Sequence, residues 1–394
     1  GYCVLLPIDW RFAIISKKID SCVYTLKLSC EGRNSNEKLL ALKAIGEMII
    51  KCFTELKNVI PNDGFLIKIC QETVPLIENE LSKSNPYNVK SMAVFAAGNL
   101  AFGIRERKSE NYFVPPASIQ SLMSKVCSCL DDKNEKVVGN AIRSVGHLAF
   151  IVFHPPYSSY LESDPTSKKL FTFAMKQLCQ KACQASMRQA VLSMTWKERS
   201  SAKKHGWGAC HAIGHLMTCS LVLSPENLKM SQEACASLVS CIKNYQVINK
   251  KIFIAACVAL QRIEHASLEV LCRRTGILGV ALSSCLDILV DSKRSFQIIE
   301  EEAESIMNHI LPIISVLDAR VVLRSGNFTS DLLYYLYDWM TQNTTTRDAF
   351  EKFAMALEQA GGFDIRLEQQ FACRAAWSYR AEFVEEQISP EDEL

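Results

Sequence analysis

The stretch that decides the fold is Ala93-Val94-Phe95-Ala96-Ala97-Gly98-Asn99-Leu100-Ala101, an apolar run built around a glycine. When the chain is aligned on that glycine, the pattern recurs with glycine in four copies and glutamine in a fifth, at Gly46, Gly98, Gly146, Gly214 and Gln261. Alanine stands five residues earlier in every copy, at Ala41, Ala93, Ala141, Ala209 and Ala256. The copies follow at intervals of 47 to 52 residues, apart from one interval of 68 that marks an insertion.

This repetition predicts stacked helices. Apolar residues recur at helical spacing through most of the chain, whereas alternating β-branched runs bounded by turns are nearly absent. Small residues at the alanine and glycine positions let neighbouring helices approach closely. One helix pair cannot bury both of its faces, so several pairs must stack into a continuous core. We therefore expect an all-α fold, a right-handed α-solenoid or superhelix.

The repeats also predict the domain organisation. We expect a single α-solenoid over residues 1–394, with recognisable repeats over 37–265 and an insertion at about 154–204, in which 154–168 and 184–204 form exposed loops. Residues 266–394 are expected to hold degenerate helical repeats and a C-terminal cap with an acidic tail, because terminal repeats need an atypical outer face.

Three stretches carry a family resemblance, which covers about residues 37–265. Residues 130–148, which begin Leu-Asp-Asp-Lys-Asn-Glu-Lys-Val, resemble a HEAT repeat, whose second helix follows an acidic turn, and Ala93 to Ala101 looks like the third helix of an armadillo repeat. Lys204 to His215 is similar to a Trp-Asn-Ala-Cys-Tyr-Ala-Ile-Gly-Asn run in the C-terminal part of the family of HEAT-repeat-containing protein six. The resemblance implies a HEAT/armadillo-type scaffold. Val138 and Gly206 stand where HEAT repeats often carry arginine, which puts the usual Asp–Arg ladder in doubt.

The composition limits the partners. Forty-four basic and 42 acidic residues give a net charge of +2, so the whole chain has no strong field that would attract nucleic acid. No apolar run reaches the roughly 18 residues that a membrane span needs. The 17 cysteines are scattered through apolar segments, which indicates buried thiols in a reducing compartment and hence a cytoplasmic or nuclear location. We expect protein partners, no membrane association and no small-molecule substrate.

The strongest functional hypothesis concerns a polar stripe on the second helix of each repeat, which lines the concave face of a solenoid. The stripe consists of Lys43, Glu47, Phe95, Asn99, Arg143, His147, His211, His215 and Arg262. We expect Asn99 to hydrogen-bond an extended peptide backbone beside the wall formed by Phe95. A nuclear-transport-like adaptor is an alternative, although the Trp and Asn ladder of such adaptors is replaced here by Arg143 with His147 and by His211 with His215. The stripe would otherwise be only a solvated helix face.

Two further alternatives come from other residues. A predicted basic loop beside Trp196 and Trp207 would suit nucleic acid, and it comprises Lys197, Arg199, Lys203 and Lys204. His211 and His215, with Cys219, would suit a metal site. A zinc protease needs a glutamate directly after the first histidine, and the sequence has Ala212 there. We therefore expect no metal, no cofactor and no catalytic residues, and hence no enzyme activity.

Overall fold

The computed structural model describes residues 8–60, 63–82, 85–161, 164–186, 193–243 and 250–263, with 267, 270 and 271. All regular secondary structure in these residues is helical, which confirms the predicted all-α class for this part of the chain. The chain divides into two compact units, Gly1–Leu271 and Cys272–Leu394, and every described residue belongs to the first. The degenerate repeats and acidic tail predicted for 266–394 lie outside the described residues, apart from those last three positions.

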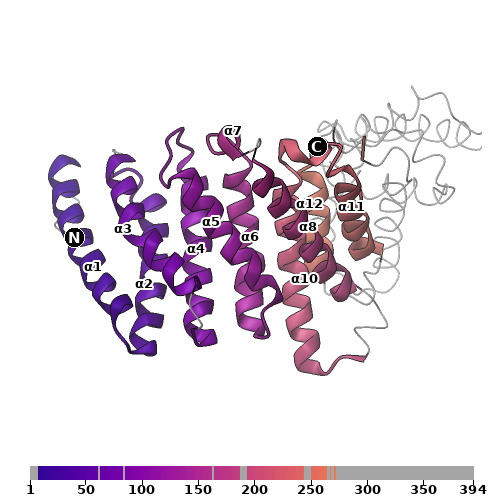
Figure 1. The fold of residues 1–394 in the computed structure, drawn as a ribbon, viewed down its shortest axis with the longest axis horizontal. Coiled ribbons are helices and arrows are strands. Elements are labelled where there is room, and N and C mark those ends of the chain that lie inside the picture. Colours follow the sequence, from indigo (N-terminus) through magenta and orange to yellow (C-terminus); the bar gives the residue numbers. More distant parts are fainter. Residues whose placement is uncertain are drawn as a thin grey trace, which may run out of the picture. The chain divides into compact units, whose positions relative to one another are not determined.

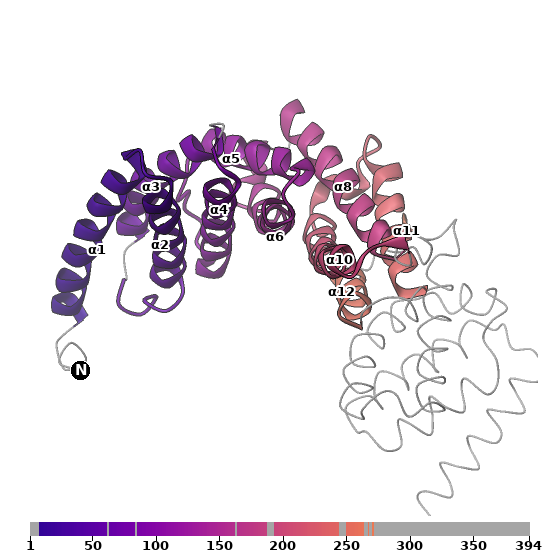
Figure 2. The same cartoon turned by 90° about the horizontal axis from the view of Figure 1, so that it is seen from below.

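The helices of the first unit form pairs in two layers. The first helices of the pairs are α1 (Ile8–Glu31), α3 (Asp63–Ser82), α5 (Pro116–Ser128), α8 (Pro165–Ser186) and α11 (Leu228–Lys243). The second helices are α2 (Ser35–Phe53), α4 (Tyr87–Arg107), α6 (Glu135–Val152), α10 (Trp196–Leu216) and α12 (Lys250–Gln261). Figure 2 shows the second helices along the inner side of a curved row, and each packs against the next. This arrangement is an α-solenoid, and Figure 1 shows its helices side by side.

The repeated glycines are the points of closest approach between successive inner helices. A Cβ atom on Gly46 would lie 3.0 Å from the Cα atom of Ala96 in the next inner helix. The corresponding distance is 3.0 Å from Gly146 to Ala212 and 2.8 Å from Gly214 to Ala259. The contacted residue stands two positions before the aligned position of the next copy in each case. The recurrence of glycine in the sequence therefore reflects one packing rule: glycine sets the distance between successive inner helices.

A ladder of ion pairs joins the first repeats, with lysine in place of the arginine of HEAT repeats. Lys38 in α2 donates to Glu80 at 3.2 Å, and Lys90 in α4 donates to Asp132 at 2.7 Å. The hydrogen bond to Asp132 raises the pKa of Lys90. Both lysines stand eight residues before the aligned glycine, and the next copy has Val138 there. Val138 has no charge with which to extend the ladder, in keeping with the doubt that this residue raised about an Asp–Arg ladder.

Parts of the two segments predicted to be exposed loops are helical, at 158–161, 165–168, 184–186 and 196–204, whereas 162–163 and 187–192 lie outside the described residues. The segment before α8 contains the short helix α7 (Ser158–Leu161) and Tyr157, which is buried and whose hydroxyl accepts a hydrogen bond from the backbone amide of Val114 at 3.1 Å. At the other end, Thr195 and Glu198 form a capping box that begins α10 at Trp196. The predicted basic loop is therefore the first turns of a helix.

Most of the described cysteines are core residues, whereas Cys22 is exposed and Cys183 is partly exposed. Cys210, Cys235, Cys241 and Cys257 are all buried, as the sequence predicted. Burial raises the pKa of Cys127 to about 12, which leaves its thiol protonated and unreactive at neutral pH. Among the helices that the structure describes, none is long and apolar enough to span a bilayer.

Candidate functional site

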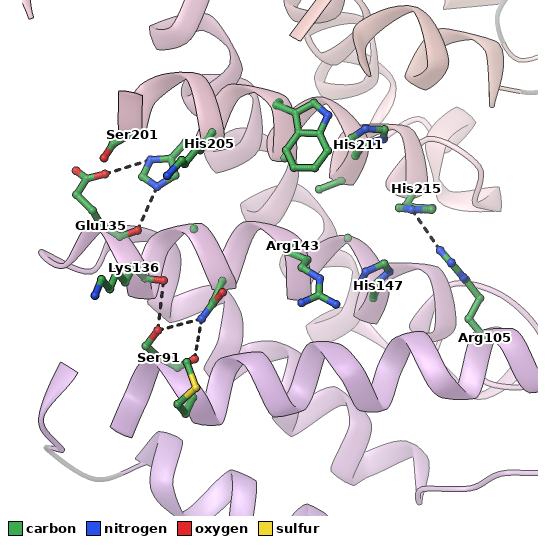
Figure 3. Close-up of a pocket in the computed structure, with 18 of the residues that line it drawn as sticks. Ser91, Arg105, Glu135, Lys136, Arg143, His147, Ser201, His205, His211 and His215 are labelled. Atoms are coloured by element: carbon green, nitrogen blue, oxygen red, sulfur yellow. Dashed lines mark hydrogen bonds and ion pairs between the residues drawn. The ribbon is translucent and has the colours of Figure 1, made fainter. Parts of the chain in front are cut away.

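The concave face carries a groove of about 730 Å³ along α4, α6 and α10. Figure 3 shows its side chains converging from neighbouring helices. The stripe residues that line it are Arg143, His147, His211, His215 and Arg262. Arg262, which directly follows α12, closes one end of the set. The structure thus brings together the stripe of three successive repeats, whereas Lys43 and Glu47 on α2 lie outside this groove.

Arg143 is held in place by two residues of the preceding inner helix. Its guanidinium donates to Asn99 Oδ1 at 2.9 Å and lies 5.3 Å from the ring centroid of Phe95. Asn99 in turn donates to the backbone oxygen of Gly46 at 3.2 Å and is only 3 % exposed. The expectation that Asn99 reaches a bound peptide is wrong, because burial between helices commits its amide to positioning Arg143.

His215 lies between two arginines. Its Nε2 atom is 3.5 Å from a guanidinium nitrogen of Arg105 and 3.3 Å from one of Arg262. Guanidinium nitrogens only donate, so Nε2 must accept and the imidazole must be neutral. The His147 ring is 5.9 Å from the His215 ring, centroid to centroid. Charged or titratable groups from α4, α6, α10 and the end of α12 therefore surround His215: Arg105, His147, His211 and Arg262.

The pKa values of the histidines fix the charge of the groove. Burial and then the charge of Arg262 lower the pKa of His211 to about 4. Burial, followed by repulsion from the nearby arginines, lowers the pKa values of His147 and His215 to about 3. All three imidazoles are consequently neutral at pH 7, and the positive charge comes from arginine and lysine alone.

The groove is strongly basic although the chain is nearly neutral. Its basic lining residues are Arg105, Lys136, Arg143, Lys204 and Arg262. Glu135 is the acidic residue among the lining, and it pairs with His205 at 3.4 Å. Arg105 pairs with the adjacent Glu106 at 2.8 Å. No carboxylate in the described part of the chain pairs with Arg143 or Arg262.

An aromatic surface adjoins this charge. Trp207 in α10 is 46 % exposed, and its indole meets the ring of His211 edge to face at 5.4 Å. On the other side, Arg105 and Arg262 also line a second hollow of about 780 Å³ with Phe150 and Pro156. The groove therefore has a basic centre with an apolar surface on either side.

The remaining predicted residues are less involved. Of the predicted basic loop, Lys204 lines the groove, whereas Lys197, Arg199 and Lys203 are not part of its lining. The structure does not support the metal hypothesis, because no group of three or more His, Cys, Asp or Glu side chains among the described residues could hold a metal ion.

Arg105 is the residue that the sequence reasoning missed. Continuing the stripe along the same helix face from Asn99, in steps of three residues, reaches Phe102 and then Arg105. The Arg105 guanidinium lies 4.8 Å from the Phe102 ring centroid. The predicted stripe stopped at Asn99 on this helix because only positions close to the repeated glycine were aligned, and Arg105 lies six residues further along.

The solved structures similar to this chain include engineered and designed proteins. A designed armadillo repeat protein is 14 % identical over 73 % of this chain and 98 % of its own length, with a TM-score of 0.44. Computationally designed armadillo repeat proteins for modular peptide recognition give 15 % identity, 73 % and 98 % coverage and a TM-score of 0.43. An engineered protein gives 13 % identity, 75 % and 97 % coverage and a TM-score of 0.43. No protein-family model matches the chain, and no curated protein matches it.

Proposed function

We propose that this protein is a non-catalytic scaffold that binds an extended segment of a protein partner in the concave groove. The observation that carries the proposal is the pair of arginines, Arg143 and Arg262, that face the groove without a carboxylate partner in the described residues. Arginine beside an exposed tryptophan is the composition of an energetically dominant binding site, and Trp207 lines the same groove.

The groove is also prepared for binding. Arg143 is fixed by Asn99 and Phe95 before any ligand arrives, so less side-chain entropy is lost on association. The inner helices are rigidly spaced by the glycine contacts, and a site on packed helices keeps its geometry better than one on loops. These features favour recognition of a defined segment over non-specific adhesion.

A helical-repeat nucleic-acid-binding protein is the second candidate. Lys204 and Trp207 lie close together on α10 and line the groove, which would suit a phosphate and a stacked base. The positive charge is concentrated around His147 and His215, whereas a nucleic-acid backbone needs charge spread along its track. The nuclear-transport-like adaptor is disfavoured, because a basic localisation peptide would meet like charge in this groove.

We further propose that the scaffold is of the type found in the family of HEAT-repeat-containing protein six, and that the protein is located in the cytoplasm or the nucleus. The similarity of residues 204–215 to the family of HEAT-repeat-containing protein six supports a scaffold of that type. Buried, protonated thiols such as Cys127 fit the reducing cytoplasm or nucleus.

The test is a quantitative affinity capture with isotope-labelled extracts. The Arg143→Gln/Arg262→Gln variant is compared with Lys43→Gln/Lys51→Gln, which removes the same charge from the exposed surface of α2 outside the groove. We expect the first variant to lose specific proteins that the second retains, with both variants keeping the helical circular dichroism of the wild type. Equal retention by the two variants would rule out the groove as the binding site.

A further inference from the structure

The centre of the groove is an accumulation of positive charge that the described residues do not neutralise. Arg105 and Arg262 each come within 3.5 Å of the same nitrogen of His215. Arg143 acts on the neighbouring His147 together with those two arginines. Three guanidiniums therefore surround two neutral rings, an arrangement that is unfavourable until an anion enters.

The charge at this centre can be counted. Arg105, Arg143 and Arg262 contribute three positive charges, and Glu106, which pairs with Arg105, contributes one negative charge. The centre thus has a net charge of two positive units, because the histidines are neutral. Burial lowers the pKa values of Arg143 and Arg262, so their charged forms are held partly out of water.

An unused polar atom lies at the same place. The Nδ1 atom of His147 is buried and has no hydrogen-bond partner among the residues that the structure describes. A buried polar atom left unpaired is destabilising, and in a native protein it commonly marks a position that a ligand or water completes. It adds a hydrogen-bonding group to the arginines around it.

We propose that the groove recognises a phosphorylated serine or threonine side chain in an extended peptide, with the phosphate bound by Arg105, Arg143 and Arg262 beside His147. This inference rests on the proposed function and names the ligand chemistry of that site. A phosphate monoester carries about −1.5 to −2 charges at pH 7 and three acceptor oxygens, which matches the charge and the donors of the centre. A single carboxylate would leave a positive charge uncompensated.

The apolar surfaces beside the centre define the rest of the ligand. Trp207 offers an exposed ring on one side, and Phe150 and Pro156 line the adjoining hollow on the other. A peptide can place one side chain on each surface while its phosphate occupies the centre. RNA fits less well, because repeated phosphates would need further cationic positions and several aromatic platforms.

The test uses fluorescence anisotropy with three pools of short fluorescein-labelled peptides. The pools are degenerate except for a central phosphoserine, serine or glutamate, and labelled oligouridine is a fourth probe. We expect the full chain to bind the phosphoserine pool at least about tenfold more tightly than the serine pool, in keeping with charge-assisted pairing to arginine. The Arg262→Gln and Arg143→Gln variants should each lose most of that preference, and Lys43→Gln should retain it.

A second measurement follows the histidines of the wild-type protein, so it does not depend on any variant folding correctly. Histidine nitrogen and carbon NMR shifts should report higher pKa values for His147 and His215 when the phosphopeptide is bound, because an anion stabilises imidazolium. Equal binding of the phosphoserine and serine pools would overturn the phosphate inference while leaving the peptide groove intact. Preference for glutamate over phosphoserine, or for oligouridine over every peptide pool, would also overturn it, and the latter would refute the proposed function as well.

Discussion

The same repeat positions carry different chemistry on two helices of the inner layer, α2 and α6. On α2, Lys43 and Glu47 form an ion pair of 3.8 Å along one helix, and both side chains are more than half exposed. On α6, the aligned positions hold Arg143, which is exposed like Lys43 but is held by Asn99 and Phe95, and His147, which is only partly exposed. Neither residue has an acidic partner in the described residues. The two helices therefore differ in how their charge is paired, although the repeat positions are the same.

The largest expected effect is on stability, and it tests the glycine packing rule that α2, α6 and α10 share. Gly214→Val should destabilise the fold by at least about 2 kcal/mol, because even the first added carbon would lie 2.8 Å from the Cα atom of Ala259. Gly46→Val should have a similar effect, since its Cβ atom would lie 3.0 Å from Ala96.

The matched control for these variants is Gly139→Ala in α6. Its new Cβ atom would lie 3.5 Å from His205, an ordinary contact, and alanine is a better helix former, so stability should rise by up to about 0.5–1 kcal/mol. Urea unfolding measures all three. A Gly214→Val protein as stable as the wild type would refute the packing rule.

The next largest effect compares the stability contributed by a mostly buried ion pair with that of an exposed one. Lys90→Met should destabilise the protein by about 1–2 kcal/mol, because Lys90 and Asp132 are mostly buried and the variant removes the donor to Asp132 Oδ2, which leaves only the backbone amide of Asn134 on the carboxylate. Lys43→Met should change stability by less than about 0.5 kcal/mol, because its ion pair is exposed. Thermal or urea unfolding of both variants checks the difference, and equal losses would contradict it.

Acid should destabilise the protein through the histidines of the groove. The pKa of His147 and of His215 is about 3, and that of His211 about 4, against roughly 6.5 in an unfolded chain. The unfolded state therefore binds more protons, so the free energy of unfolding should fall as pH decreases below about 6.5 and continue to fall to about pH 3.

A histidine variant isolates this contribution. His211→Gln/His215→Gln removes two of the three titrating rings, so it should lose less stability than the wild type between about pH 7 and pH 5. Urea titrations at both pH values provide the measurement. Identical pH slopes for variant and wild type would show that these rings titrate normally in the folded protein.

The sequence predicted the layers of this fold better than the details of the site. The glycine and alanine positions recur because every inner helix meets the next one in the same way, so packing is visible as repetition. Lys43 and Arg143 look equivalent in that repetition. Their difference comes from neighbours far along the chain: Arg143 contacts Asn99, and His215 contacts Arg105, which is 110 residues away. The helix over 196–204 was missed because charged residues there resemble a loop, although Thr195 and Glu198 carry a capping signal.

The most direct measurement of the account is photo-crosslinking from two positions, with a benzophenone amino acid replacing Trp207 in the groove or Leu40 on α2. Both residues are exposed in the free protein, 46 % and 63 % respectively. We predict that position 207 crosslinks a defined partner peptide, that Arg143→Gln/Arg262→Gln abolishes this product, and that position 40 does not yield it. The same product from position 40, or a product at 207 that survives loss of both arginines, would contradict the claim that the unpaired arginines make this groove the binding site.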